Sequence, residues 1–311
     1  MAVISPPGAG AGGVRRSARP ARPGQRPRWA GWGFVSPFLV AFALVFLAPI
    51  VYSVHLSLYR NQLIGGNHFV GLANYTQALH DHEFWSGLGR VGLFLVVQVP
   101  IMLGIALLVA LALDSGRLYG RDFFRISIFL PYAVPSVVAA LMWGFILGDR
   151  FGLVASVNAH LHTSIPDPLA PHWVLAGIGT IVTWEFVGYN MLIFYAALRT
   201  VPESLYEAAE IDGAGQWRII AAVKLPAIRG ALVITTVFSI IGSFQLFNEP
   251  SILKSLAPNA ITTYFTPNTY TYALSFSGQE HNYAAAVAVV MGVLTMVVAY
   301  TVQLRGMRKD V

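Results

Sequence analysis

Polar and aromatic side chains stand inside apolar segments of this chain, where they could contact a solute that crosses a membrane. Flat aromatic faces stack on the C–H faces of sugar rings, and amides and hydroxyls hydrogen-bond to ring hydroxyls. This mixture of side chains therefore predicts a path for a saccharide. The candidates are, in chain order, Tyr132, Ser136, Trp184, Glu185, Tyr189, Asn190, Ser239, Ser243, Phe244, Gln245 and Asn248.

Several of these residues have a second interpretation that the sequence leaves open. Ser239 and Ser243 are four apart, a small-residue spacing that also marks helix packing. Trp184 and Tyr189 belong to types that populate membrane interfaces, although both lie well inside their segment. Glu185 is the one acidic residue deep in a segment, so it has either a functional role or a paired structural role.

The charge of the path indicates the charge of the solute. We find no clear Lys or Arg inside the core of the apolar segments. A path for an anion often has a basic residue or a helix N-terminus at the middle of the membrane. The sequence therefore favours a neutral solute.

The elements that position these residues are predicted to be membrane-spanning helices. The chain is 56% hydrophobic and only 11% charged, whereas soluble domains have about 25% charged residues. Six segments are long enough for the ~20 residues that cross the hydrocarbon core. We predict an all-α membrane protein with helices at roughly 34–58, 88–113, 124–147, 173–198, 228–247 and 283–304. The apolar runs do not alternate, which excludes barrel strands.

The basic residues predict the orientation. Sixteen of the 20 Lys and Arg residues fall on one side if the N-terminus is cytoplasmic, and the exceptions are Arg60, Arg90, Arg150 and Lys254. Both termini are therefore expected in the cytoplasm. Membrane orientation explains the net charge of +6, and no nucleic-acid partner is expected.

The chain organises into a tail and one membrane domain. Residues 1–28, rich in Gly, Pro, Ala and Arg, predict a disordered basic cytoplasmic tail, and 29–308 form the transmembrane domain. Outer loops are expected at 59–87, 148–172 and 248–282. Pro131 and Pro135 either kink the third helix for packing or break it beside the solute path.

The sequence has no phosphate-binding loop of its own. Such a loop needs Gly-Lys followed by Ser or Thr, and none of the three lysines, Lys224, Lys254 and Lys309, follows a glycine. No metal site is expected, because the His80/His82 and His160/His162 pairs lack a third ligand at a recognised spacing. Energy must come from another polypeptide.

The cytoplasmic segment 199–227 predicts two short helices around a glycine. Thr200 and Glu203 have the capping-box spacing, and Val201, Leu205, Ala208 and Ala209 share one helix face. Gly213 is expected to end this helix in the left-handed conformation. The second helix runs over Trp217, Ile220, Ala221 and Lys224 and is expected to end at Leu225-Pro226.

This segment resembles the EAA loop of permease subunits in binding-protein-dependent ABC importers. The matching residues are Glu207, Ala208, Ala209, Asp212, Gly213, Leu225 and Pro226, with Val223 in place of the usual Ile. The resemblance implies the type I importer permease fold, and it implies that the segment docks in a cleft of a separate ATPase. Glu207 would pair there with a basic residue.

Other segments are similar to carbohydrate-type, maltose-like permeases. They are Phe69 to Tyr75, Trp32 to Arg60 and Phe129 to Tyr132. This similarity implies a plasma-membrane subunit for import of a sugar, and an oligosaccharide is favoured. It implies a second permease chain, two ATPase copies and an extracytoplasmic solute-binding protein, with ATP and Mg on the ATPase and no cofactor on this chain.

Three alternatives remain open at this level. A stand-alone secondary carrier would need inverted repeats and several acidic residues in the membrane core. A membrane-embedded enzyme would need a nucleophile and a base at one depth. The third alternative, inside the ABC class, is an importer for polyols or glycerol phosphodiesters.

Overall fold

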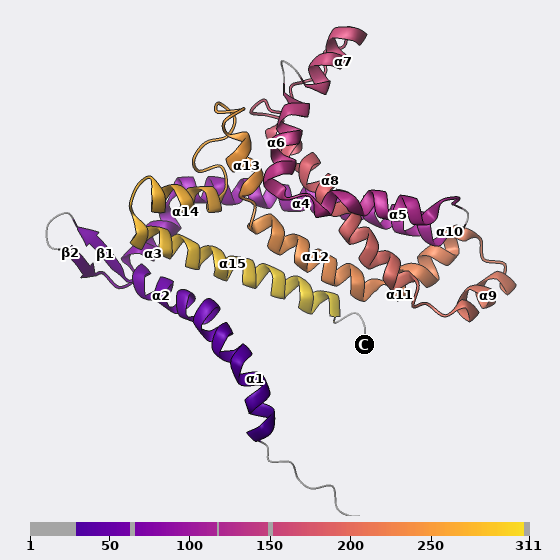
Figure 1. The fold of residues 1–311 in the computed structure, drawn as a ribbon, viewed down its shortest axis with the longest axis horizontal. Helices are drawn as coiled ribbons and strands as arrows, with labels where there is room; N and C mark the ends of the chain where they lie inside the picture. The colour runs from indigo at the N-terminus through magenta and orange to yellow at the C-terminus, as the bar shows by residue number, and fades with distance from the viewer. Residues whose placement is uncertain (1–28, 63–65, 117, 149–151, 308–311) are drawn as a thin grey trace, which may run out of the picture. The chain divides into compact units, whose positions relative to one another are not determined.

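The computed structural model describes residues 29–62, 66–116, 118–148 and 152–307. The predicted tail over residues 1–28 lies outside the described residues. The chain divides into two compact units, Met1–Val51 and Tyr52–Val311. Figure 1 draws the described helices and strands of both units.

The first unit contains helix α1 (Trp29–Phe42), a π-helical turn η1 (Ala43–Leu47) and the start of α2 (Ala48–Ser57). The π-turn directly precedes Pro49: the Ala48 amide donates to the Ala43 carbonyl, five residues back. A wider turn keeps the proline ring away from the carbonyl with which it would otherwise clash. The apolar side chains are exposed, Phe34 by 90%, as expected for a helix that faces lipid.

The second unit is a bundle of four long helices. They are α4 (His82–Asp114), α8 (Val174–Leu198), α12 (Arg229–Phe244) and α15 (His281–Met307). Helix α4 packs along α8, and α12 packs against both α4 and α15 (Figure 1). The core between α4 and α8 includes Met102, Ala106, Met191 and Phe194. Close van der Waals packing of these side chains holds the helices together, because lipid tails are as apolar as the core and burial alone gives no driving force.

The predicted third helix, 124–147, is two helices in the structure. Helix α5 (Arg121–Phe129) leads into a 3₁₀ turn η2 (Leu130–Ala133), and α6 (Ser136–Leu147) leaves at an angle of 100°. Pro131 and Pro135 cause the break, because proline removes backbone donors and disfavours helical geometry in the residue before it. Five described helices can cross a membrane, and the bent pair counts as a sixth.

Helices also extend into the segments predicted as outer loops. Helix α4 begins at His82 instead of residue 88, and the outer end adds α3 (Ala73–His80), α7 (Leu153–Leu161), α13 (Asn248–Leu253) and α14 (Pro267–Phe276). The all-α prediction misses one small antiparallel hairpin, β1 (Tyr59–Gln62) with β2 (Gly66–Phe69), in which Tyr59 pairs with Phe69. The fifth helix ends at Phe244, and the predicted residues 245–247 form the break before α13.

Hydrogen bonds join the elements at the outer end. The Asp81 carboxylate caps α4 by accepting from the Glu83 and Phe84 amides, and the hydroxyls of Tyr270 and Tyr283 donate to it at 2.7 and 2.5 Å. Burial raises the pKa of Asp81, but these hydrogen bonds outweigh burial and hold the pKa below its usual value. Asp81 thus connects α4 with α14 and α15.

The first outer loop is anchored by a buried asparagine. The Asn74 amide nitrogen donates to the Ser57 and Tyr59 carbonyls, each at 2.8 Å, and its oxygen accepts from Arg60. The Tyr75 hydroxyl lies 2.5 Å from the Ser57 hydroxyl. These contacts give the Asn-Tyr pair, noted above for its resemblance to carbohydrate-type permeases, a structural role.

Candidate functional site

A central cavity of about 360 Å³ opens between α4, the α5–α6 bend, α8 and α12. This volume falls in the range of ~300–1,000 Å³ typical of small-molecule sites. Its lining residues, in chain order, are Phe94, Gln98, Val99, Met102, Tyr132, Ser136, Val182, Phe186, Tyr189, Asn190, Phe238, Ser239, Gly242, Ser243, Gln245, Leu246, Phe247, Asn248 and Glu249.

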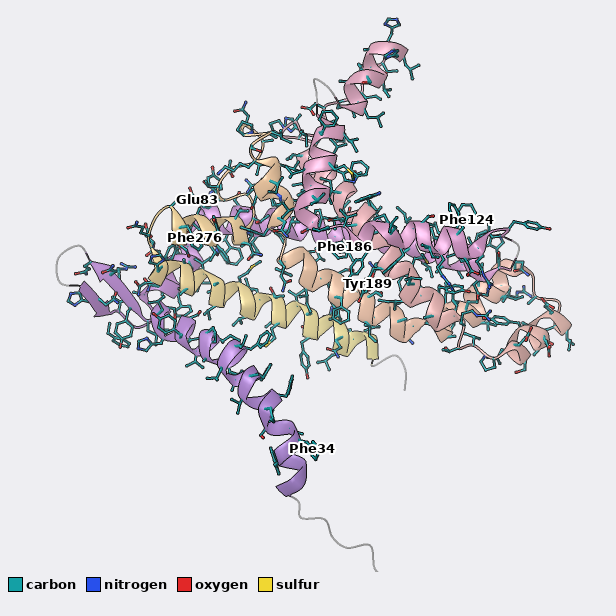
Figure 2. All side chains as sticks on the ribbon, in the orientation of Figure 1. Phe34, Glu83, Phe124, Phe186, Tyr189 and Phe276 are labelled. Atoms are coloured by element: carbon teal, nitrogen blue, oxygen red, sulfur yellow. The ribbon has the colours of Figure 1, made fainter. Side chains whose placement is uncertain are left out.

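The proline break positions an aromatic cluster on the cavity wall. The ring of Tyr132 stacks on Tyr189 with centroids 4.8 Å apart, and it meets Phe186 edge-on at 5.8 Å. Figure 2 labels Phe186 and Tyr189 on α8. Helix α5 approaches α8 closely, since a Cβ at Gly188 would collide with the Ile128 carbonyl oxygen. A flat aromatic surface results at the bend.

Amides and hydroxyls supply the polar part of the wall. The Asn248 amide donates to the Ser136 hydroxyl at 2.8 Å, which links the start of α13 to the start of α6. The buried Asn190 amide donates to the Phe186 carbonyl at 3.0 Å. The Ser243 hydroxyl donates to the Ser239 carbonyl. These groups can exchange hydrogen bonds with a polar ligand.

The lining contains one ionisable acid, Glu249, and no Lys, Arg or His. Glu249 is only 6% exposed. On α8, Glu185 lies close enough to interact electrostatically with Glu249. Glu185 is 3% exposed, and its Oε2 has no hydrogen-bond partner among the described residues. Among the residues that the structure describes, the lining therefore contains no cationic side chain.

Eight of the eleven predicted path residues line the cavity, and three do not. Trp184 does not line the cavity: its ring meets Trp143 edge-on at 5.8 Å beside a second hollow, which shares Phe94 and Gln98 with the cavity. Glu185 is buried near Glu249 without reaching the lining. Phe244 packs in the core with Val91 and Ile240. The rotation of α8 and α12 about their axes decides which of these residues face the cavity. This rotation cannot be predicted from the sequence, because both segments are mostly apolar.

The sequence interpretation overlooked the contribution of α4. Gln98, which donates a hydrogen bond to Thr183 on α8, lines the cavity together with Phe94, Val99 and Met102. A signal was available for Gln98, since it is the one amide in the apolar run 91–113. Polar residues inside a membrane helix usually mark a pathway. The apolar lining residues had no such signal.

The second candidate region is the segment 199–227, hereafter the coupling loop. Helix α9 (Glu203–Ile211) ends in a Schellman motif: Ala214 N–H donates to Ala209 O, and Gly213 N–H donates to Glu210 O. Gly213 has a φ of +72°, a conformation that a side chain would strain. The predicted role of Gly213 as the helix stop is confirmed.

The predicted start of this helix is wrong. Thr200 does not cap it, because its hydroxyl donates to the Ala197 carbonyl, and Pro202 occupies the cap position without a side-chain hydrogen bond. Val201 consequently lies outside the helix. Helix α8 ends two residues before Thr200, so the Thr200 hydroxyl can donate to a carbonyl in the last turn of α8.

The second part of the coupling loop is also different from the prediction. Helix α10 (Gln216–Ile219) continues through a π-turn η3 (Ile220–Lys224) into α11 (Leu225–Ala227), so Leu225-Pro226 does not end the helical segment. The Leu225 amide donates to the Ile220 carbonyl, five residues back. The π-turn η3 precedes Pro226 in the same way that η1 precedes Pro49. In both places the wider turn keeps the proline ring away from a backbone carbonyl of the preceding turn.

The motif residues of the coupling loop are largely accessible. Glu207, Ala208, Asp212, Gly213 and Pro226 are exposed, while Ala209 and Leu225 are partly buried. Large apolar side chains are exposed beside them, Ile211 by 87% and Trp217 by 81%. An acidic helix with small residues and exposed apolar neighbours is suited to dock on another protein.

Membrane-length helices surround a mostly apolar cavity that carries a few amides and hydroxyls, and a helical loop projects from one end. These are the features of an integral membrane transport subunit. Residues 102–308 match the family described as binding-protein-dependent transport system inner membrane component. The chain belongs to this family. It is a multi-pass permease subunit of the inner membrane and not an enzyme.

Curated relatives support the assignment over nearly the whole chain. The chain is 34% identical to a lactose transport system permease protein of Rhizobium radiobacter, over 87% of this chain and 91% of that protein. It is 30% identical to an arabinooligosaccharides transport system permease protein of Bacillus subtilis, over 86% and 85% respectively.

Among solved structures, the fold is similar to a chain of a bacterial ABC transporter involved in the import of the acidic polysaccharide alginate. The TM-score is 0.76, with 20% identity over 90% of this chain and 96% of that chain. At this identity the likeness shows the fold alone.

Proposed function

We propose that this permease imports a neutral saccharide and that the central cavity is its share of the path. One observation carries the proposal: stacked Tyr132 and Tyr189 share the cavity lining with amides and hydroxyls, and the described lining residues include no Lys, Arg or His. Aromatic faces bind sugar C–H surfaces, and polar groups bind their hydroxyls. The names of the lactose and arabinooligosaccharide relatives agree with this substrate class.

The coupling loop is proposed to receive the force of ATP hydrolysis. Exposed Glu207 and Ala208 on α9 fit a cleft on a separate ATPase, and none of the chain's lysines stands in a phosphate-binding sequence. ATP and Mg would therefore bind to the ATPase and no cofactor to this chain. The full importer would comprise a second permease, two ATPase copies and an extracytoplasmic solute-binding protein.

Transport would follow alternating access. The loaded binding protein docks at the outer end of the bundle, and ATP-driven closure of the ATPase pair moves the coupling loop. The cavity then opens outward to accept the sugar, and hydrolysis returns it to the inward state. The bend at Pro131 and Pro135 places Tyr132 where such a movement would change the cavity wall.

The test is sugar uptake by the reconstituted importer with its binding protein. Tyr189→Ala removes the aromatic face and is expected to lower uptake by about fivefold, because a stacked aromatic contributes ~1 kcal/mol. Tyr189→Phe keeps the ring and is expected to retain most uptake. Trp184→Ala is the matched control, since Trp184 lies outside the lining.

The two arms of this test separate the alternatives. Loss of uptake in Trp184→Ala with normal uptake in Tyr189→Ala would contradict the assignment of the cavity. Equal uptake of a neutral sugar and of its uronic acid analogue by the wild-type importer, with binding proteins for each, would contradict the neutral substrate class.

A further inference from the structure

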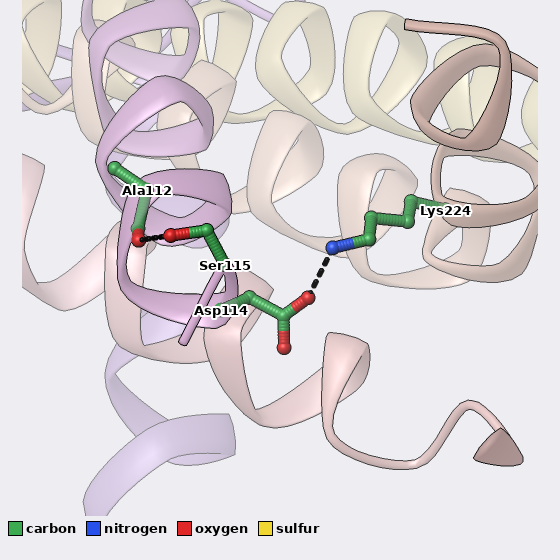
Figure 3. Close-up of polar contacts among 4 residues, drawn as sticks. All are labelled: Ala112, Asp114, Ser115 and Lys224. Atoms are coloured by element: carbon green, nitrogen blue, oxygen red, sulfur yellow. Dashed lines mark hydrogen bonds and ion pairs between the residues drawn. The ribbon is translucent and has the colours of Figure 1, made fainter. Parts of the chain in front are cut away.

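A buried ion pair joins the cytoplasmic end of α4 to the coupling loop. Lys224 Nζ lies 2.5 Å from Asp114 Oδ2, and the two side chains are only 11% and 8% exposed (Figure 3). The other ion pair among the described residues, Asp122–Arg125, lies within one helix and is exposed. A pair between separate elements, shielded from water, is screened far less than a surface pair.

Asp114 is in a position where it needs a partner. It is the last residue of α4, and the C-terminus of a helix carries partial negative charge that disfavours a carboxylate. The Lys224 ammonium offsets both the charge of the Asp114 carboxylate and the partial negative charge of the helix end. Asp114 also continues the helix whose Met102 lines the cavity, about 18 Å away along the axis at 1.5 Å per residue.

Lys224 in turn is held by the coupling helix. Its Nζ lies 5.3 Å from the ring centroid of Tyr206, which stands on α9 next to Glu207. The Tyr206 hydroxyl is buried without a hydrogen-bond partner among the described residues. Burial and the Asp114 carboxylate raise the pKa of Tyr206. The three side chains form a continuous contact from α9 to α4.

We propose that Asp114, Lys224 and Tyr206 are positioning residues that make α4 move with the coupling loop. A displacement of α9 would pass through Tyr206 and Lys224 to Asp114, and so along a rigid helix to one wall of the cavity. This inference rests on the proposed coupling role of the loop. The buried pair links two elements of this chain, whereas the proposed ATPase contact uses the exposed residues beside the pair.

The decisive variant replaces both partners, Asp114→Asn with Lys224→Met. It removes the electrostatic link without leaving an unpaired buried charge, so it is expected to fold. In the complete importer in liposomes, we expect normal ATPase binding but uptake per ATP hydrolysed lower by roughly tenfold, since the pair's low-dielectric attraction is gone. The matched control is Asp122→Asn with Arg125→Met.

Wild-type uptake per ATP in the double variant would overturn the inference. A parallel fall of thermal stability, ATPase rate and uptake, with their ratio unchanged, would also overturn it by assigning the pair a purely structural role. Failure of the coupling proposal itself has a different signature. In that case Glu207→Lys would leave ATPase binding and uptake unchanged.

Discussion

The central cavity and the cytoplasmic end of the bundle place their polar groups in opposite ways. The cavity wall presents amides, hydroxyls and aromatic rings, and Glu249 supplies the one carboxyl group among its described lining residues. The cytoplasmic end has a buried ion pair, Asp114–Lys224, under an exposed acidic helix. Under the two proposals above, the contrast means that solute contact would use many exchangeable hydrogen bonds, whereas force transmission would use one fixed electrostatic link.

The largest expected effect is at the cytoplasmic end. Glu207→Lys reverses an exposed charge on α9 and is expected to reduce uptake to background, because like charges repel at the proposed ATPase contact. Binding of the ATPase, measured by co-purification, and uptake should fall together. Asp122→Lys makes the same charge change at an exposed site on α5 and should leave both within about twofold.

A smaller effect sharpens the description of the cavity. Tyr132→Ala and Tyr189→Ala each remove one half of the same stack, so their effects on uptake should not add. We expect the double variant to be within about threefold of the worse single variant. Fully additive losses would show that the two rings act on the solute independently.

Glu185 allows the functional and structural interpretations to be separated. Its buried Oε2 lacks a partner among the described residues, so Glu185→Met should leave stability unchanged or raise it by about 1 kcal/mol. Thermal unfolding in detergent measures this change. Uptake decides the role: loss of uptake with retained stability assigns Glu185 a functional role beside Glu249, and normal uptake assigns it none.

The smallest effect concerns the outer end, away from both regions. Asp81→Asn weakens the hydrogen bonds from Tyr270 and Tyr283 and should cost about 1 kcal/mol, since Asp81 is partly exposed. Because the folded pKa of Asp81 lies below its usual value, its stabilisation is present above that usual value and is lost as the pH falls through the folded pKa. The variant should lack this acid-dependent loss in thermal unfolding.

Much of the architecture was predictable because it depends on local chemistry. Membrane-length apolar runs and the stop at Gly213 follow from hydropathy and backbone sterics. For Pro131 and Pro135 the sequence left a kink and a break open, and the structure shows the break. The predictions at Thr200 and Leu225-Pro226 were wrong because neighbouring turns compete for the same backbone groups. A capping-box spacing in the sequence does not show whether the threonine hydroxyl will cap the following helix or donate to a carbonyl of the preceding one.

The sequence by itself determined that this chain is a multi-pass membrane subunit with an EAA-type segment over residues 199–227, since composition and motif spacing are local properties. The tertiary structure alone decided which side chains meet. Helix rotation turned Trp184 away from the cavity and brought Gln98 into it. It also brought Asp114 against Lys224, 110 residues apart, because a long-range contact depends on how whole helices pack, which no short stretch of sequence encodes.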